Sequence, residues 1–289
     1  MKDPDVPVYK SNRHFEIANF DDAKGTMKLI VGKQRYYALR DLINSKQISL
    51  LQAWDIKSMK RIETEVPLIP CGAIYDPSLI RTFARAPPMT DTALVKFLSS
   101  RRRHQKFCYF SLGSFAGINH GKLVALLTSL IVGVDQLGLR LMIIFHHPFS
   151  DKSSALSEFL EKNSHCILQV DGFLPHEWIV PRMDFVITTG STCLNNICLV
   201  AKKPTVYVPI ISEQFFWAKN YQYQTNVPYV DIHRDFDKLD LLQIKMSSIL
   251  RLSLRGKKAE RYLSVVSDSM TKNIGPINIA KVVTGRVDN

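Results

Sequence analysis

The chain has little cysteine and no long hydrophobic run. Its 289 residues include five cysteines, scattered and odd in number, and the longest apolar run, Leu123–Val134, is too short to cross a bilayer. The first ten residues, MKDPDVPVYK, contain no apolar signal-peptide core. We therefore expect reduced cysteines rather than disulfides, no metal site, no membrane-spanning segment and a cytoplasmic protein.

Acidic residues are fewer than basic ones. The formal net charge is +12, and the densest basic run is Arg101-Arg102-Arg103-His104 with Lys106. The favoured interpretation is a solvated surface segment near a domain junction, and a contact with nucleic acid, anionic lipid or another polyanion is the alternative. No zinc-finger, basic-zipper or RNA-recognition pattern accompanies the run. We therefore expect no nucleic-acid partner, and peripheral membrane association stays an alternative.

Apolar residues make up 46% of the chain and charged residues 22%, as in an ordinary globular protein. From Lys106 onward, short apolar runs alternate with amphipathic segments of helical length, which is the pattern of βαβ units. The expected strands are Phe107–Leu112, Leu141–Phe145, Cys166–Val170, Phe185–Thr189, Thr205–Pro209 and Pro228–Asp231. The expected helices are Lys122–Gly133, Ser154–Lys162, Thr192–Ala201, Glu213–Tyr221, Lys238–Leu252, Lys257–Thr271 and Pro276–Val283.

These elements predict an α/β fold: a doubly wound, Rossmann-like sheet of six parallel strands that binds ligands at the strands' carboxyl ends. We assign residues 106–289 to this domain, including its C-terminal helical tail. Residues 76–105, punctuated by Asp76-Pro77 and Ala86-Pro87-Pro88, are interpreted as a linker. Residues 1–75 are a small, incomplete α/β segment, in which we expect strands at Thr26–Val31 and Ile48–Trp54 and a helix at Arg35–Ile43.

Three turns after predicted strands carry residues suited to a phosphate and a sugar. Ser111-Leu112-Gly113-Ser114 has small residues that let a ligand approach the backbone. Thr189-Gly190-Ser191-Thr192 opens a helix whose first N–H groups would attract a phosphate. Glu213-Gln214 offers donors and acceptors for sugar hydroxyls. Taken singly, each also fits an ordinary turn or a capped helix start.

The spacing of these turns resembles that of a known family. Residues 173–218 read FLPHEWIVPRMDFVITTGSTCLNNICLVAKKPTVYVPIISEQFFWA. Their PHEWIVP and EQFFWA stretches are similar to motifs of UDP-dependent glycosyltransferases of the GT-B fold, especially the sterol and antibiotic glucosyltransferase branch. Tyr109–Ser114 and Leu68–Gly72 extend the resemblance. It implies the C-terminal, donor-binding half of a GT-B enzyme, with a UDP-sugar as donor substrate and no separate cofactor.

The resemblance also implies roles for individual residues. Phe173 stands where a ring stacks on uracil, and the backbone of Leu174 would read the edge of the base. Glu213 and Gln214 match an Asp-Gln pair that holds the transferred sugar, and Ser114 would approach the diphosphate. The remaining residues of the predicted donor site are His176, Thr189, Gly190, Ser191, Thr192 and Cys193.

The phosphate turn departs from the family pattern. Thr189 replaces a histidine that contacts the diphosphate, and Ser191-Thr192-Cys193 replaces Gly-Ala-Gly. Leu194 and Asn195 replace two threonines, and Ile197 stands where many members have a ribose-binding glutamate. The helix dipole survives these changes, but losing one well-aimed donor can lower a rate by about 10²–10³.

The N-terminal part departs from the family in length. In the family, the acceptor half holds a histidine that deprotonates the acceptor, and it is normally about as long as the donor half. No position here matches that base: His14 is the only histidine in the first hundred residues, and no family motif surrounds it. The catalytic residue is therefore left unassigned.

The sequence thus predicts a UDP-glycosyltransferase-like protein. It would transfer a hexose from a UDP-sugar to an acceptor hydroxyl with inversion, as part of a longer or two-part enzyme whose acceptor site comes from an upstream domain or a partner chain. The alternative is a degenerate, catalytically inactive module of this family that binds a nucleotide or a protein.

Overall fold

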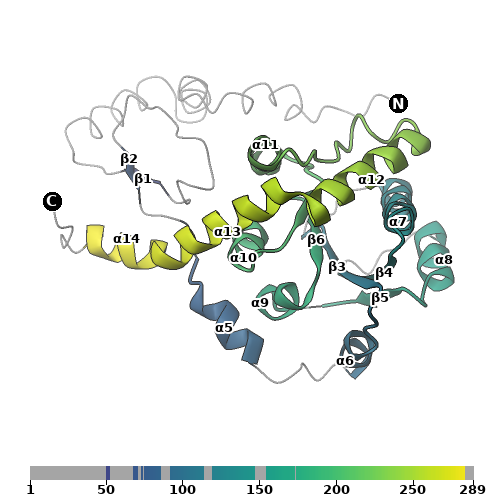
Figure 1. Ribbon diagram of the computed structural model, residues 1–289, viewed down its shortest axis with the longest axis horizontal. Coiled ribbons are helices and arrows are strands. Elements are labelled where there is room, and N and C mark those ends of the chain that lie inside the picture. The colour runs from purple at the N-terminus through teal and green to yellow at the C-terminus, as the bar shows by residue number, and fades with distance from the viewer. Residues whose placement is uncertain are drawn as a thin grey trace.

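A computed structural model describes residues 50–52, 68–70, 73, 75–85, 92–113, 119–146, 154–172 and 174–283 (Figure 1). The predicted site residues Ser114 and Phe173 lie outside the described residues, as do the predicted strand Thr26–Val31 and helix Arg35–Ile43. Within the predicted strand at residues 48–54, β1 (Leu50–Gln52) pairs in parallel with β2 (Leu68–Pro70).

Five parallel strands form the central sheet. In chain order they are β3 (Gln105–Ser111), β4 (Arg140–His146), β5 (Ile167–Val170), β6 (Phe185–Thr188) and β7 (Thr205–Tyr207). Their spatial order is β5-β4-β3-β6-β7, so the direction of strand addition reverses between β3 and β6. This order is that of a doubly wound Rossmann-like sheet, and it confirms the predicted fold class.

The sixth predicted strand, Pro228–Asp231, is wrong, because the structure has no strand there. One ladder-like hydrogen bond forms, from Val230 N to Tyr207 O at 2.9 Å. Pro228 has no N–H to donate, and Asn226, two residues earlier, has a left-handed backbone, with φ 63°. Asp231 is drawn into a turn instead, since its N–H donates to Asp235 Oδ2 at 2.6 Å.

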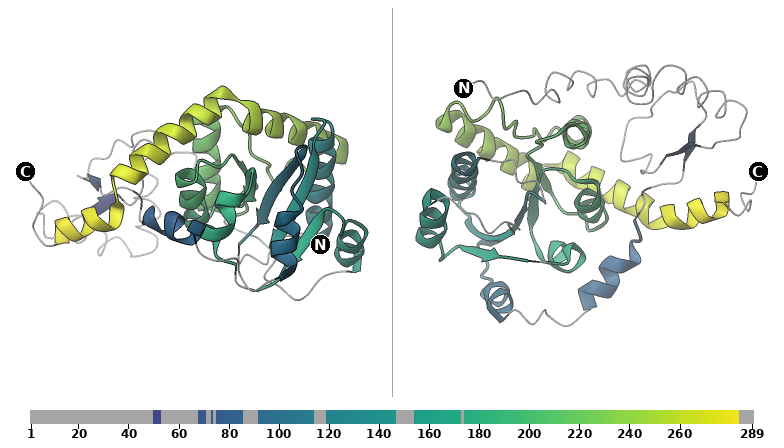
Figure 2. Two further views of the ribbon diagram at one scale, coloured as in Figure 1. Left: turned by 60° about the horizontal axis from the view of Figure 1, so that its bottom comes forward. Right: turned by 180° about the vertical axis from the view of Figure 1, so that it is seen from behind.

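Among the described residues, seven of the α-helices beyond β3 overlap those predicted, and the four-residue helix His176–Ile179 was not predicted. Their bounds are α7 (His120–Asp135), α8 (Ser154–Lys162), α9 (His176–Ile179), α10 (Thr192–Val200), α11 (Ser212–Thr225), α12 (Leu239–Arg255), α13 (Lys257–Lys272) and α14 (Gly275–Val283). Helices α7 and α12 pack together on one side of the sheet, and α9 and α10 on the other (Figure 1). Figure 2 shows α12, α13 and α14 following one another along the domain. No helix among the described residues is long and apolar enough to cross a membrane.

The segment interpreted as a linker contains two short helices, α5 (Ser78–Arg85) and α6 (Thr92–Ser99). Helix α5 contacts α9, and Leu94 of α6 is fully buried. The ring of Phe97 meets that of Phe107 edge-on, with centroids 5.7 Å apart. These parts of the segment therefore pack onto the α/β domain, a tertiary contact that the weak periodicity of two eight-residue helices does not reveal.

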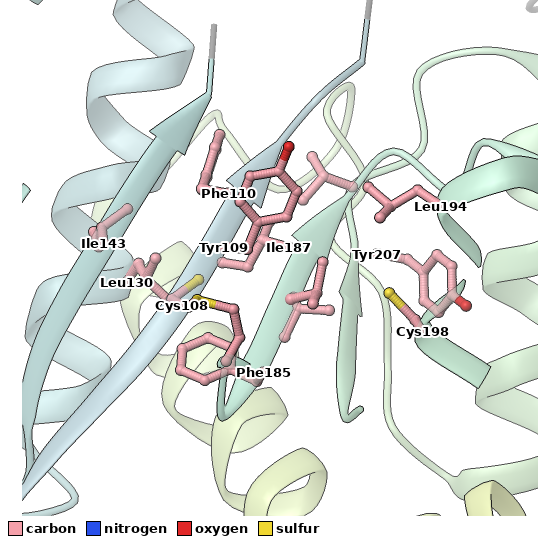
Figure 3. Packing of buried hydrophobic residues seen from close by; sticks show 14 of the residues in the cluster. Cys108, Tyr109, Phe110, Leu130, Ile143, Phe185, Ile187, Leu194, Cys198 and Tyr207 are labelled. Atoms are coloured by element: carbon pink, nitrogen blue, oxygen red, sulfur yellow. The ribbon is translucent and has the colours of Figure 1, made fainter. Parts of the chain in front are cut away.

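The core lies on both faces of β3. Cys108 and Phe110 alternate with Phe107 and Tyr109 along the strand, and all four are fully buried, as expected for a central strand covered on both sides. Figure 3 shows the ring of Tyr109 with its hydroxyl directed toward the carboxyl ends of the strands. Tyr109 is thus a core residue whose polar end reaches the edge where ligands are expected.

Part of the basic run is used inside the domain, at the amino ends of β3 and β6. Asp184 Oδ2 accepts hydrogen bonds from Arg101 Nη2 at 2.5 Å and from Phe107 N at 2.8 Å, while Asp184 Oδ1 lies 3.3 Å from Lys106 Nζ. The Asp184 side chain is only 15% exposed. Arg102, Arg103 and His104 are exposed, as the solvated interpretation of the run expects.

We predict that Asp184→Ala lowers the free energy of unfolding by about 2–3 kcal/mol, because it leaves two cations and a backbone N–H without their acceptor. Asp268→Ala is the matched control. Asp268 pairs with Lys202 at 3.0 Å but is 60% exposed, so its loss should cost less than about 0.5 kcal/mol. Urea denaturation of both variants checks the difference, and equal losses would show that the Asp184 contacts do not stabilise the fold.

Candidate functional site

The carboxyl ends of the strands stand in one row. Ser111 at the end of β3 is in register with His146 of β4 and Thr188 of β6, and these are in register with Val170 and Tyr207. The strand order reverses between β3 and β6, and the carboxyl ends of the strands at such a reversal are where parallel α/β sheets generally bind ligands. The turns named from the sequence follow this row.

The turn from β6 into α10 needs the glycine that the sequence places there. Gly190 has φ +96°, and its N–H donates to Thr188 Oγ1 at 3.2 Å. A Cβ at this position would lie 3.0 Å from Tyr207 Cδ1 and 3.4 Å from the backbone oxygen of Gln214. Gly190 therefore makes a sharp turn where no side chain fits, and it brings the predicted phosphate turn against the predicted sugar-binding turn.

The predicted phosphate turn leads into the amino end of α10. Ser191 is the N-cap residue, but its side chain makes no capping hydrogen bond. Thr192 Oγ1 accepts from Trp217 Nε1 at 3.3 Å, which ties α10 to α11. Thr189 is buried, at 1% exposure, whereas Cys193 is exposed. The Ser191 side chain thus leaves the helix terminus uncapped, and a helix terminus of this kind carries a partial positive charge that attracts anions.

Gln214 has a structural use that the sequence did not reveal. Its Oε1 accepts from Ile210 N at 2.8 Å and from Ile211 N at 3.2 Å, so it closes the turn before α11 as in half of a capping box. The carboxamide nitrogen is then the group of Gln214 that suits a sugar oxygen. The backbone of Glu213 lies in the first turn of α11.

A hydrogen-bonded cluster joins β3, β4 and α9 at the same edge. Tyr109 Oη lies 2.8 Å from His146 Nδ1 and 3.1 Å from His176 Nδ1, and His146 Nε2 lies 2.7 Å from Gly172 O. Burial, and then the repulsion that a protonated His146 exerts, lowers the pKa of His176 to about 4. His176 is therefore neutral at physiological pH, beside the buried Leu174.

His176 and Leu174 were named from the sequence, whereas Tyr109 and His146 were missed. His146 directly follows the predicted strand Leu141–Phe145, so its place at the carboxyl end of a strand was a usable signal. Tyr109 lies inside an apolar run and gave no such signal.

Two further groups near α10 were also missed. The Tyr207 hydroxyl donates to Asn195 Oδ1, while Asn195 Nδ2 is buried with no partner among the described residues. Tyr75, which precedes α5, is buried, and burial followed by the charges of Glu177 and Cys193 raises the pKa of its phenol. Ile197, at the position of the family's glutamate, is fully buried. Within the described residues, no group of three or more His, Cys, Asp or Glu side chains could hold a metal ion.

Solved structures of glycosyltransferases share this fold. The glycosyltransferase of kitacinnamycin superposes with a TM-score of 0.59 at 14% identity, over 83% of this chain and 55% of its own. A UDP-glucose:anthocyanidin 3-O-glucosyltransferase solved with UDP gives a TM-score of 0.58 at 13% identity, over 82% and 52%. The chain therefore has the fold of one half of a GT-B glycosyltransferase.

Two sequence relatives are sterol glucosyltransferases. A sterol 3-beta-glucosyltransferase of Saccharomyces cerevisiae (strain YJM789) is 28% identical over 127 residues, and one of Eremothecium gossypii is 25% identical over 129 residues. These matches cover 43% and 44% of this chain but only 10% of each relative. No protein-family model matches the chain. The predicted resemblance to GT-B glycosyltransferases of the sterol branch is confirmed, and the chain matches only a small part of these sterol enzymes.

We predict that Gly190→Ala lowers the free energy of unfolding by roughly 2–4 kcal/mol, since φ +96° and contact with Tyr207 both disfavour a Cβ. Gly138→Ala is the matched control, because Gly138 has φ +69° but nothing within 4 Å of the added Cβ. It should cost about 1–2 kcal/mol, from backbone strain alone. Chemical denaturation measures both variants, and a Gly190 variant no worse than the control would contradict the crowding.

A second prediction concerns pH. The pKa of His176 lies near 4 in the folded protein, below its ordinary 6.5, so the unfolded chain takes up this proton first as the pH falls. Stability should therefore be full above about pH 6.5 and fall toward pH 4, by up to about 1.4 kcal/mol per pH unit. His176→Asn, whose amide can still meet Tyr109, should show a shallower decline in denaturation experiments between pH 7 and pH 5. An unchanged slope would place the titrating group elsewhere.

Proposed function

We propose that this chain is the donor-binding half of a glycosyltransferase that moves a hexose from a UDP-sugar to an acceptor hydroxyl. The observation that carries the proposal is the contact between two turns. The amino end of α10, suited to a diphosphate, lies against the start of α11, where Glu213 and Gln214 suit a sugar. A nucleotide sugar has these two chemical groups side by side, and the motif spacing supports the same order.

In this proposal, different residues bind the uracil, the diphosphate and the sugar of the donor. Phe173 stacks on uracil, the Leu174 backbone reads the edge of the base, and His176 binds the nucleoside. Ser114 and the turn of Thr189, Gly190, Ser191, Thr192 and Cys193 take the diphosphate. Gln214 donates its carboxamide N–H to the sugar, and Glu213 accepts from a sugar hydroxyl. The site needs no cofactor or metal besides the donor.

The reaction is a displacement at the anomeric carbon. An acceptor oxygen forms the new bond there with inversion, while the bond to the UDP oxygen breaks and UDP leaves with the electron pair. The amino end of α10 stabilises the charge that develops on the diphosphate. A base takes the proton of the acceptor hydroxyl, and we assign no residue of this chain to that role.

The chain spans about a tenth of the length of the curated relatives and about half of the solved structures it matches. We propose that an upstream domain or a partner chain supplies the acceptor site and the base. The described cysteines, Cys108, Cys166, Cys193 and Cys198, are free thiols, which supports a cytoplasmic location.

The alternative function, a nucleotide- or protein-binding module without activity, is favoured by specific departures in the phosphate turn. Thr189 is buried where the family has a histidine, and Ile197 is buried where many members have a glutamate. Both changes remove polar contacts to the donor while they leave the helix terminus in place.

Calorimetric titration of the wild-type chain with UDP and UDP-glucose tests the proposal. We expect both to bind, and no binding at millimolar ligand would rule out the donor site. Hydrolysis of UDP-glucose by the chain would exclude the inactive module. Binding without hydrolysis or transfer, even when the full-length protein is supplied with candidate acceptors, would favour it.

Gln214→Glu sharpens the test, because the carboxylate keeps the acceptor for the Ile210 and Ile211 N–H groups but loses the amide donor. We predict that UDP-glucose affinity falls about tenfold relative to UDP affinity, the value of one hydrogen bond. Gln222→Glu adds the same charge at an exposed position of the same helix and should leave that ratio unchanged. Equal losses for both ligands at Gln214 would mean that its amide does not contact the sugar.

A further inference from the structure

The cluster of Tyr109, His146 and His176 has one consistent arrangement of protons when both imidazoles are neutral. A backbone carbonyl can only accept, so His146 Nε2, 2.7 Å from Gly172 O, carries the hydrogen. His146 Nδ1 is then a bare lone pair, and the hydrogen of the Tyr109 hydroxyl, 2.8 Å away, points to it. Each proton position follows from the one before.

The position of the Tyr109 hydrogen also determines which nitrogen of His176 is protonated. With its hydrogen committed to His146, the Tyr109 oxygen can only accept from His176 Nδ1, 3.1 Å away. A neutral imidazole carries one hydrogen, so His176 Nε2 keeps its lone pair. The proton position of a residue in the proposed donor site is thus set by a carbonyl two hydrogen-bonded side chains away.

We propose that His146 and Tyr109 are positioning residues of the donor site: they hold His176 as the tautomer protonated on Nδ1 and tie down the loop that precedes the base-binding residues. The inference rests on the proposed function. The loop is held at Gly172, whose φ is +81° and which lies two residues before Leu174. The two contacts on Tyr109 join residues 37 and 67 positions away in the chain.

This arrangement selects the chemistry that His176 can read. A lone pair at Nε2 accepts a hydrogen bond, whereas every oxygen of an ionised diphosphate is also an acceptor. His176 is therefore matched to a hydrogen-bond donor of the nucleoside, either a ribose hydroxyl or the imide N–H of uracil, and not to the phosphates. UDP compared with 2′-deoxy-UDP, 3′-deoxy-UDP and N3-methyl-UDP distinguishes these sources.

Nitrogen-15 NMR of the histidine rings reads the protons directly. In the wild-type chain we expect the hydrogen on Nε2 of His146 and on Nδ1 of His176, assigned with the variants His146→Gln and His176→Asn. His176 protonated on Nε2, or His146 protonated on both nitrogens, would overturn the inference. This measurement needs no ligand.

Substitutions test the positioning role. Tyr109→Phe should weaken UDP binding about tenfold and shift His176 toward a mixture of tautomers, because its Nδ1–H loses its acceptor. Tyr221→Phe is the matched control: Tyr221 is also buried, but its ring packs against Tyr207 and Tyr262 rather than against the histidines. It should bind UDP within about twofold of the wild type. Tyr109→Phe that binds UDP like the control would overturn the proposal.

Two variants of His146 separate its contacts. His146→Asn places an acceptor near the position of Nδ1 but does not reach Gly172, so it should preserve the His176 tautomer and still weaken UDP. His146→Gln places a donor near the position of Nε2, so it should keep the loop and lose the tautomer. Identical behaviour of the two would contradict separate roles. If the wild-type chain binds no UDP, the proposed function fails. The His176 tautomer in Tyr109→Phe, compared with the wild type, then decides by itself whether Tyr109 and His146 set the proton position of His176.

Discussion

The pairing of β3 with both β4 and β6 is the constraint on which the rest of the structure depends. It places Ser111, His146 and Thr188 in one row and reverses the strand order at the centre of the sheet. The chain leaves β3, β5, β6 and β7 at that edge. The hydrogen-bonding contacts of Tyr109 with His146 and His176 join residues that this pairing brings to one edge.

Within that edge, the phosphate turn keeps its backbone while losing family side chains. Gly190 retains φ +96°, and α10 begins with an N-cap that makes no side-chain hydrogen bond. An anion site built from backbone N–H groups tolerates substitutions such as Thr189 and Cys193 better than one built from side chains. In the proposed donor site, binding and catalysis therefore have different requirements: a helix terminus attracts the diphosphate, whereas catalysis needs donors aimed at developing charge and a base.

Much of the fold could be predicted from the sequence, since buried parallel strands are continuous apolar runs and their helices are amphipathic. Five of the six strands and the seven helices predicted from Lys122 onward overlap observed elements. The strand predicted at Pro228–Asp231 does not form, because Pro228 has no N–H to donate and the Asp231 N–H is used in a turn with Asp235. Helices α5 and α6 were missed because each has only eight residues and is held by contacts with α9 and Phe107.

The sequence by itself determined the class of protein and the position of the turns, because a glycine in a sharp turn and residues that follow a strand are local features. The tertiary structure alone decided what several side chains do. The side-chain oxygen of Gln214 accepts hydrogen bonds from two backbone N–H groups, and the Asp184 carboxylate binds Arg101 and Lys106 of the basic run. Tyr109 meets His146 and His176 only because parallel pairing brings β4 and the loop after β5 beside β3. Such contacts depend on strand order, which no local pattern in the chain records.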